Sequence, residues 1–286
     1  GASIEEFGTR VFEHDSPHAA YACGMLCNAA GLLEQAVRWF VQSVALAPRS
    51  TTYLALGSTL MALGRWDDAL AALSRATEID PNLLPAYFRI AAVHRSQGRI
   101  DENIRVLQNA LQHFARSRHR CYLHNELGLA LEMTGDLEGA AKQFEAAATA
   151  RHVDTIPMLA NLALVLHKLA RHADARELVE RIIARRQNQA RIHDRSDTCF
   201  LIYYVLGNSQ LEGGNSVAAR ESFTRCLEFN PNSASAYNSL ALACVAAGDP
   251  TEAIRALREA LRIAPAFETA KRNLDRLAGR AEAARL

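Results

Sequence analysis

The chain has 286 residues, of which 49% are hydrophobic, and its 32 Lys and Arg residues nearly balance its 31 Asp and Glu residues. This neutral balance argues against nucleic acid as a partner, because nucleic-acid-binding domains usually carry a strong positive charge. No apolar run approaches the ~18 residues of a membrane span, and the N-terminus lacks a basic segment followed by an apolar run, so neither a transmembrane segment nor an intact signal peptide is visible.

Residues 1–16 predict a helix that caps the N-terminal end of the fold or is the remainder of an earlier repeat. Ile4, Phe7 and Val11 recur at roughly helical spacing. Glu5 stands early in the segment, where a carboxylate stabilises the positive end of a helix dipole. These residues share no register with the pattern that follows them.

Paired helical patterns begin after this segment, and the clearest pair lies between residues 53 and 81. A glycine separates its two helical patterns and a proline follows the second. The glycine is expected to end the first helix, because the left-handed conformation is low in energy only for glycine. The marker residues of this pair are Tyr53, Leu56, Gly57, Gly64, Ala69 and Pro81.

The same pattern recurs along the chain. The small residue that we call the landmark follows a leucine, or Cys23 and Ile90 in the first and third repeats. It stands at positions 24, 57, 91, 128, 163, 207 and 241, at intervals of 33, 34, 37, 35, 44 and 34 residues. The third repeat lacks the terminal proline, and the fifth keeps its helical periodicity but few marker residues. The predicted repeats are 17–48, 50–81, 84–115, 121–152, 156–187, 200–231 and 234–265.

This pattern resembles the tetratricopeptide repeat, in which a large residue, a Leu-Gly pair, an Ala-x3-Phe segment and a proline recur about every 34 residues. The resemblance covers about residues 17–265. It implies an all-α, right-handed superhelical solenoid of about seven helix pairs. Residues 266–286 carry an apolar stripe that includes Phe267 and Leu274, and they predict a C-terminal capping helix, since terminal repeats need a polar outer face.

One interval is ten residues longer than its neighbours, which predicts an insertion at about residues 185–198. Insertions in repeat proteins map to one face, and that face often binds a partner. Arginines in the insertion could contact an acidic partner or a phosphate backbone. The alternative is a solvated helix end and loop. The arginines of this possible contact patch are Arg185, Arg186, Arg191 and Arg195.

The resemblance also implies a partner-binding groove, because the first helices of tetratricopeptide repeats line the concave face. Its positions here are mixed apolar and amide residues, which suit an extended peptide or an amphipathic helix. The alternative for each residue is packing against the adjacent repeat. The predicted groove residues are Tyr21, Met25, Leu54, Ser58, Met61, Phe88, Arg95, Asn125, Asn161, His167, Tyr204, Asn208 and Asn238.

Two binding devices known in this family are missing from the sequence. The lysines of the clamp that holds a C-terminal carboxylate are absent. An asparagine ladder would place one asparagine per repeat two residues before the landmark, and only Asn161 stands there. The other repeats have Ala22, Ala55, Arg89, Glu126, Val205 and Ser239 at that position.

No catalytic or metal-binding motif is present. Cys121 and His124, with His119 nearby, are too few for a structural zinc site, which needs four converging ligands. We therefore expect no metal, no cofactor and no catalytic site. Four of the six cysteines fall on positions that the repeat uses for core packing, so they are expected to be small buried thiols rather than disulfide partners. These four are Cys23, Cys27, Cys226 and Cys244, and the other two are Cys121 and Cys199.

The sequence thus predicts a non-catalytic scaffold or adaptor that binds a peptide or helix of a partner protein. One alternative is a substrate-recruiting or regulatory arm of a larger enzyme. Another is an RNA-binding helical array, against which the neutral charge argues. Self-association stays open. The expected location is the cytoplasm, or the periplasm if a signal peptide has been removed.

Overall fold

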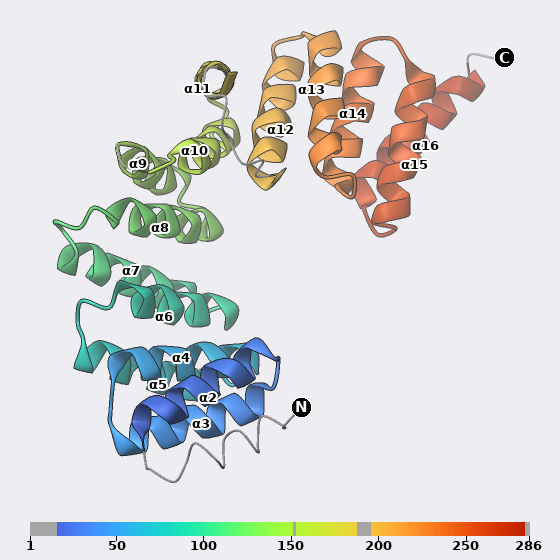
Figure 1. Cartoon of the computed structure of the whole chain (residues 1–286). Coiled ribbons are helices and arrows are strands. Elements are labelled where there is room, and N and C mark those ends of the chain that lie inside the picture. Colours follow the sequence, from blue (N-terminus) through green and yellow to red (C-terminus); the bar gives the residue numbers. More distant parts are fainter. Residues whose placement is uncertain (1–15, 151–152, 188–195, 284–286) are drawn as a thin grey trace. The chain divides into compact units, whose positions relative to one another are not determined.

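The computed structural model describes residues 16–150, 153–187 and 196–283 (Figure 1). Every regular element within these ranges is an α-helix, so the predicted all-α fold is confirmed. The N-terminal capping helix predicted for residues 1–16 and most of the predicted insertion lie outside the described residues. The chain divides into two compact units, Gly1–Gly135 and Asp136–Leu286, and the boundary falls inside the predicted repeat 121–152.

The first unit is a stack of antiparallel helices joined by short connections (Figure 1). Its helices contact one another in chain order, and the first helices of the pairs also touch, α2 with α4 and α4 with α6. Those helices therefore form one layer of the unit. The helices are α2 (Pro17–Ala29), α3 (Leu33–Leu46), α4 (Ser50–Ala62), α5 (Trp66–Ile79), α6 (Leu84–Ser96), α7 (Ile100–His113) and α8 (Arg120–Thr134).

Small landmark residues let the two helices of a pair approach closely. A Cβ atom added to Gly57 on α4 would lie 2.6 Å from the Cγ atom of Leu73 on α5. A Cβ atom on Gly24 would lie equally close to the ring of Phe40, at 2.6 Å. Leu73 and Phe40 are fully buried. The Leu-Gly pair of the sequence is therefore a packing requirement of the core.

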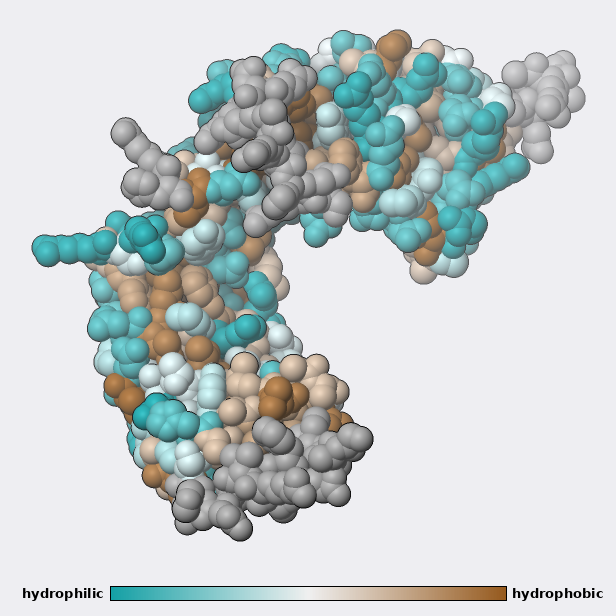
Figure 2. All heavy atoms as spheres, viewed as in Figure 1, coloured by the Kyte–Doolittle hydropathy of each residue, from teal (hydrophilic) through white to brown (hydrophobic). Residues whose placement is uncertain are grey.

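The second unit has the same construction, and it adds a final single helix. Its helices are α9 (Leu137–Ala148), α10 (Ile156–Lys168), α11 (His172–Gln187), α12 (Ser196–Glu212), α13 (Ser216–Phe229), α14 (Ala234–Ala246), α15 (Pro250–Ile263) and α16 (Glu268–Ala283). Gly207 on α12 faces Phe223 on α13, and an added Cβ atom would lie 2.8 Å from the ring. Hydrophilic and hydrophobic side chains are interspersed on the face of this unit seen in Figure 2.

The last helix, α16, completes the core of the second unit. Ala270 on α16 is fully buried, and Leu274 and Leu277 pack against the same cluster as Leu257. The side chain of Asn273 donates a 2.9 Å hydrogen bond to the side-chain oxygen of Asn238 on α14. α16 thus covers apolar and amide groups of α14 that would otherwise face water.

The pair formed by α10 and α11 departs from the other pairs at its turn. The turn residue is Ala170, with a φ angle of +58°, whereas Gly64 takes a φ angle of +73° seven residues after its own landmark. Both turns close with the same backbone hydrogen bond, from Arg171 N to Leu166 O and from Arg65 N to Leu60 O, each 2.9 Å long. The helix pair therefore keeps its turn without the glycine, although an alanine in this conformation is strained by roughly 1 kcal/mol.

All six cysteines are buried and none forms a disulfide, as the sequence predicts for Cys23, Cys27, Cys226 and Cys244. Burial raises the pKa of the Cys226 thiol to about 12. A thiol held in its protonated form is a poor nucleophile, so Cys226 serves the core as a small apolar side chain.

Candidate functional site

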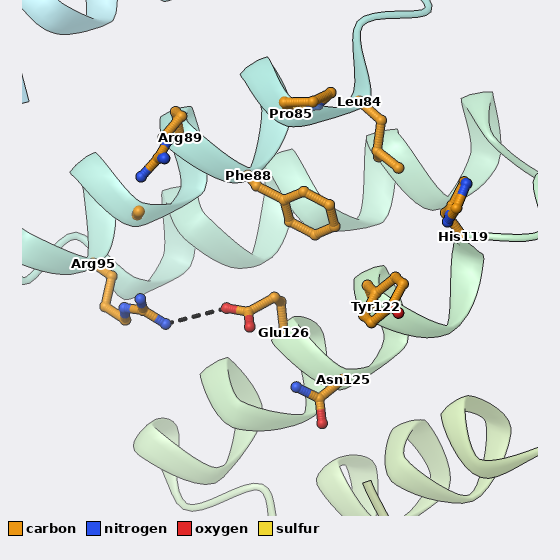
Figure 3. A pocket seen from close by; sticks show the side chains of 10 residues that line it. Leu84, Pro85, Phe88, Arg89, Arg95, His119, Tyr122, Asn125 and Glu126 are labelled. Atoms are coloured by element: carbon orange, nitrogen blue, oxygen red, sulfur yellow. Dashed lines mark hydrogen bonds and ion pairs between the residues drawn. The ribbon is translucent and has the colours of Figure 1, made fainter. Parts of the chain in front are cut away.

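An open pocket of about 710 Å³ lies between α6 and α8 of the first unit (Figure 3). Each helix contributes side chains three or four positions apart, so each presents one face to the pocket. The lining residues are Leu84, Pro85, Phe88, Arg89, Ala92 and Arg95 from α6, His119 beside the start of α8, and Tyr122, Asn125 and Glu126 from α8.

The connection before α8 shapes one side of this pocket. Residues 114–119 join α7 to α8, whereas only residues 47–49 join α3 to α4. Ser117 N donates to Phe114 O at 2.9 Å, and Arg120 N donates to Ser117 O at 3.2 Å, so the longer connection is folded into tight turns. It brings His119 to the pocket, and in the sequence it appears as the 37-residue interval between landmarks.

One end of the pocket is apolar and aromatic. The Phe88 ring projects from α6 toward α8, and Leu84, His119 and Tyr122 lie on one side of it (Figure 3). The Tyr122 and His119 rings stack with centroids 6.2 Å apart and planes 20° apart. Tyr122 remains 42% exposed. Water-exposed aromatic rings held by their neighbours are well suited to anchor a partner, because little side-chain entropy is lost on binding.

The other end of the pocket is charged. Arg95 Nη1 lies 3.2 Å from Glu126 Oε2, and the two side chains are 41% and 34% exposed. An ion pair this exposed contributes only ~0–1 kcal/mol to stability, but it fixes the direction of both side chains. Arg89 lies at the same end (Figure 3), and in the described part of the chain no carboxylate is within ion-pairing distance of it.

Three of the predicted groove residues, Phe88, Arg95 and Asn125, come together in this pocket. The other predicted residues of the first unit lie on α2 and α4. Tyr21 packs against Phe40 with ring centroids 5.8 Å apart, and Met25 is 42% exposed. Leu54 and Met61 are partly buried against the core of α2–α5, and Ser58 is half-buried.

The predicted groove residues of the second unit lie in different environments. Tyr204 stacks on Phe200, with ring centroids 5.8 Å apart, and Asn208 is half-buried. The Nδ1 atom of His167 lies 3.0 Å from that of His172 across the α10–α11 turn. Burial and the neighbouring His172 lower the pKa of His167.

Asn238 is placed differently from the prediction. It is 8% exposed and is hydrogen-bonded to Asn273 of α16, so the capping helix occupies the space in which a partner was expected. The prediction placed Asn238 on an open groove because the sequence pattern of α14 does not show what α16 covers.

Asn161 also needs a correction of register. Three residues before its landmark stands Ala160, which is 1% exposed, and Asn161 follows it and is half-buried. Asn161 thus corresponds to Arg89 and Glu126, which stand two residues before their landmarks and both line the pocket. In the first unit this position therefore lines the pocket together with the position of Phe88 and Asn125.

Sequence reasoning missed several of the lining residues. Arg89 and Glu126 were considered only as missing members of an asparagine ladder, and Tyr122 and His119 were not assigned to the groove. Tyr122 could have been found, because it stands three residues before Asn125 and so shares its helix face. His119 could not, because only the fold of the 114–119 connection brings it there.

The predicted basic contact patch is only partly within the described residues. Arg185 and Arg186 lie in the last turns of α11, and Arg191 and Arg195 lie outside the described ranges, so the patch stays a prediction. Across the described ranges no three His, Cys, Asp or Glu side chains converge as metal ligands. Among the helices that are described, none is long and apolar enough to cross a membrane.

The fold is that of a helical-repeat protein with an open pocket between two first helices, α6 and α8. Three family models agree with this class. Those described as "Tetratricopeptide repeat" match residues 88–155 and 204–266, and residues 17–42, and one described as "TPR repeat" matches residues 57–98. The chain belongs to the tetratricopeptide repeat family, whose members bind protein partners and are generally non-catalytic scaffolds.

Individual relatives are distant. Sperm-associated antigen 1 of Mus musculus is 29% identical over 82 residues, which make up 29% of this chain and 9% of that protein. In the Cut9–Hcn1 hetero-tetramer of the APC/C, the similar chain has a TM-score of 0.67 and 16% identity, over 96% of this chain and 55% of that chain. A tetratricopeptide repeat protein from Parabacteroides merdae has a TM-score of 0.65 and 12% identity, over 93% of this chain and 100% of that chain. These likenesses show the fold.

Proposed function

We propose that this protein is a non-catalytic scaffold that binds a peptide or helix of a partner protein on the first helices of its repeats. The observation that carries the proposal is the pocket between α6 and α8. Its volume of about 710 Å³ lies within the range of ~300–1,000 Å³ typical of ligand pockets. The pocket is open to solvent rather than enclosed, as a site for a peptide must be.

The chemistry of the lining also supports a peptide. Phe88 and Tyr122 offer ring surface for an apolar side chain, and aromatic residues commonly dominate the binding energy of protein interfaces. Asn125 offers an amide that can donate to or accept from a peptide backbone. Such a division into apolar anchors and backbone-directed amides is typical of grooves that bind extended or helical peptides.

The proposed groove also includes residues on other first helices of each unit. Tyr21, Met25 and Ser58 would continue the contact surface on α2 and α4, and Tyr204 and Asn208 would supply a corresponding surface on α12. Asn238 is left out, because α16 covers it.

Affinity capture followed by mass spectrometry tests the proposal. The double variant Phe88→Ala with Tyr122→Ala should lose partners that the unchanged chain retains, by about tenfold or more in affinity, because each truncation of a central aromatic anchor typically costs ~1–2 kcal/mol. The matched control is Ile79→Ala with Val217→Ala, which removes exposed apolar side chains from the second helices α5 and α13. An unchanged partner list in the pocket variant would contradict the proposal.

The same groove would serve the alternative role, as the recruiting or regulatory arm of a larger enzyme. Segments similar to this chain make up 9% of the mouse relative and 55% of the Cut9–Hcn1 chain, so repeats of this kind also occur within longer chains. Sequencing the full coding region separates the two roles, since the arm requires a catalytic domain in the same polypeptide.

A further inference from the structure

The charged end of the α6–α8 pocket has more positive than negative side chains. Three side chains there carry formal charge, Arg89, Arg95 and Glu126. Glu126 is committed to Arg95 through the 3.2 Å ion pair. Arg89 is therefore a cation beside an apolar pocket, and among the described residues it has no acidic partner.

The connection beside the aromatic end adds more positive charge. Arg116, Arg118 and Arg120 are all exposed there, and none of them has a carboxylate partner in the described ranges. Arg118 Nε donates a 3.1 Å hydrogen bond to His119 Nε2, which holds one of these cations at the pocket. Positive charge thus borders the pocket at both ends, although the whole chain is nearly neutral.

We propose that this pocket selects an acidic peptide segment, with an apolar side chain seated between Phe88 and Tyr122 and a carboxylate of the peptide paired with Arg89. This inference rests on the proposed function and adds the chemistry of the partner. The Arg89 guanidinium can donate two parallel hydrogen bonds to one carboxylate. The surrounding arginines raise the rate of encounter with an acidic segment and disfavour a basic one.

Glu126 limits the number of acidic side chains that the pocket can bind. Its carboxylate neutralises Arg95 and repels peptide acids placed close to it, so the pocket holds one acidic side chain beside the anchor rather than a run of them. Replacing Glu126 by glutamine removes the repulsion and releases Arg95 as a second partner. Binding of acidic peptides should therefore strengthen in Glu126→Gln and weaken in Arg89→Glu, although both substitutions lie at the same charged end of the pocket.

The test is selection of a random displayed peptide library against the whole chain, followed by binding measurements on the enriched peptides. Enriched sequences should carry Asp or Glu within a few residues of Phe, Trp or Leu. Their affinity should fall about tenfold in Arg89→Glu and on raising the salt concentration. A peptide with Lys in place of its acidic residue should regain affinity for Arg89→Glu. Arg38→Glu on α3 is the matched control, because it makes the same charge change on an exposed residue of a second helix, and it should leave binding unchanged.

The outcomes separate this inference from the proposed function. Loss of peptide binding in Phe88→Ala with Tyr122→Ala, but none in Arg89→Glu, would refute the acidic ligand and leave the groove in place. No enrichment at all, or binding that neither pocket variant changes, would refute both. Enrichment without acidic residues overturns the inference, as does short single-stranded RNA that competes with the peptide and loses affinity in Arg89→Glu.

Discussion

The helix pairs α4–α5 and α10–α11 are corresponding parts of two repeats, but they have different residues at the landmark and at the turn. In α4–α5 the landmark and the turn are Gly57 and Gly64, and in α10–α11 they are Ala163 and Ala170. The first pair has a glycine landmark and an unstrained turn, whereas the second has a left-handed alanine. The first helix of each pair also touches the next first helix, and the contact of α10 with α12 is more extensive than that of α4 with α6. Contacts to neighbouring helices can therefore hold a repeat together where its own marker residues are lost.

The largest expected effect comes from adding a methyl group at the landmark of the α4–α5 pair. Gly57→Ala should lower the free energy of unfolding by ~2–3 kcal/mol, because overpacking a filled core is costly and the new Cβ atom would lie 2.6 Å from Leu73 Cγ. Urea unfolding measures the change. Gly279→Ala is the control, since an added Cβ atom meets nothing within 4 Å on α16. Equal stability of both variants would show that the small landmark is not a packing requirement.

A smaller effect of opposite sign is expected at the turn of the α10–α11 pair. Ala170→Gly should raise the free energy of unfolding by ~0.5–1 kcal/mol, because glycine relieves the strain of the positive φ angle but gains more freedom in the unfolded chain. Thermal unfolding of the second unit is the measurement. Gly64→Ala in the α4–α5 pair should show the reverse change, and a loss of stability in Ala170→Gly would mean that the turn is not strained.

The smallest effect is a pH dependence that the α10–α11 pair should show and the α4–α5 pair, which has no histidine, should not. The pKa of His167 is lowered, first by burial and then by His172, although Glu212 opposes the change. The unfolded chain therefore binds the proton more readily, and stability should fall as the pH drops below ~6.5 and level off below the folded pKa. His167→Met, which copies Met61 of the α4–α5 pair, should reduce this fall. Urea midpoints compared on both sides of pH 6.5 measure it, and identical pH profiles would exclude His167 as the cause.

Much of the fold can be predicted from the sequence, because small residues recur at the same position of each repeat. A side chain would clash with the partner helix at Gly24, Gly57 and Gly207. This steric constraint is visible in the sequence as a glycine at each of these positions. The burial of Cys23, Cys27, Cys226 and Cys244 follows from the same register.

The site follows only in part, because it depends on what lies across from each helix. Phe88, Arg95 and Asn125 could be found by counting along the first helices. His119 depends on the fold of the 114–119 connection, and Asn238 depends on α16, which comes one repeat later in the chain. Periodicity assigns a residue to a face of its helix, but it does not show whether that face is open.

The hydrogen bond between Asn238 and Asn273 has a consequence for lengthening the protein. The two residues are 35 positions apart, one repeat length, so α16 stands where the first helix of another repeat would stand. A designed array with more repeats should therefore receive them between α15 and α16. Repeats added after α16 would have to pack on the polar, solvent-exposed outer face of that helix.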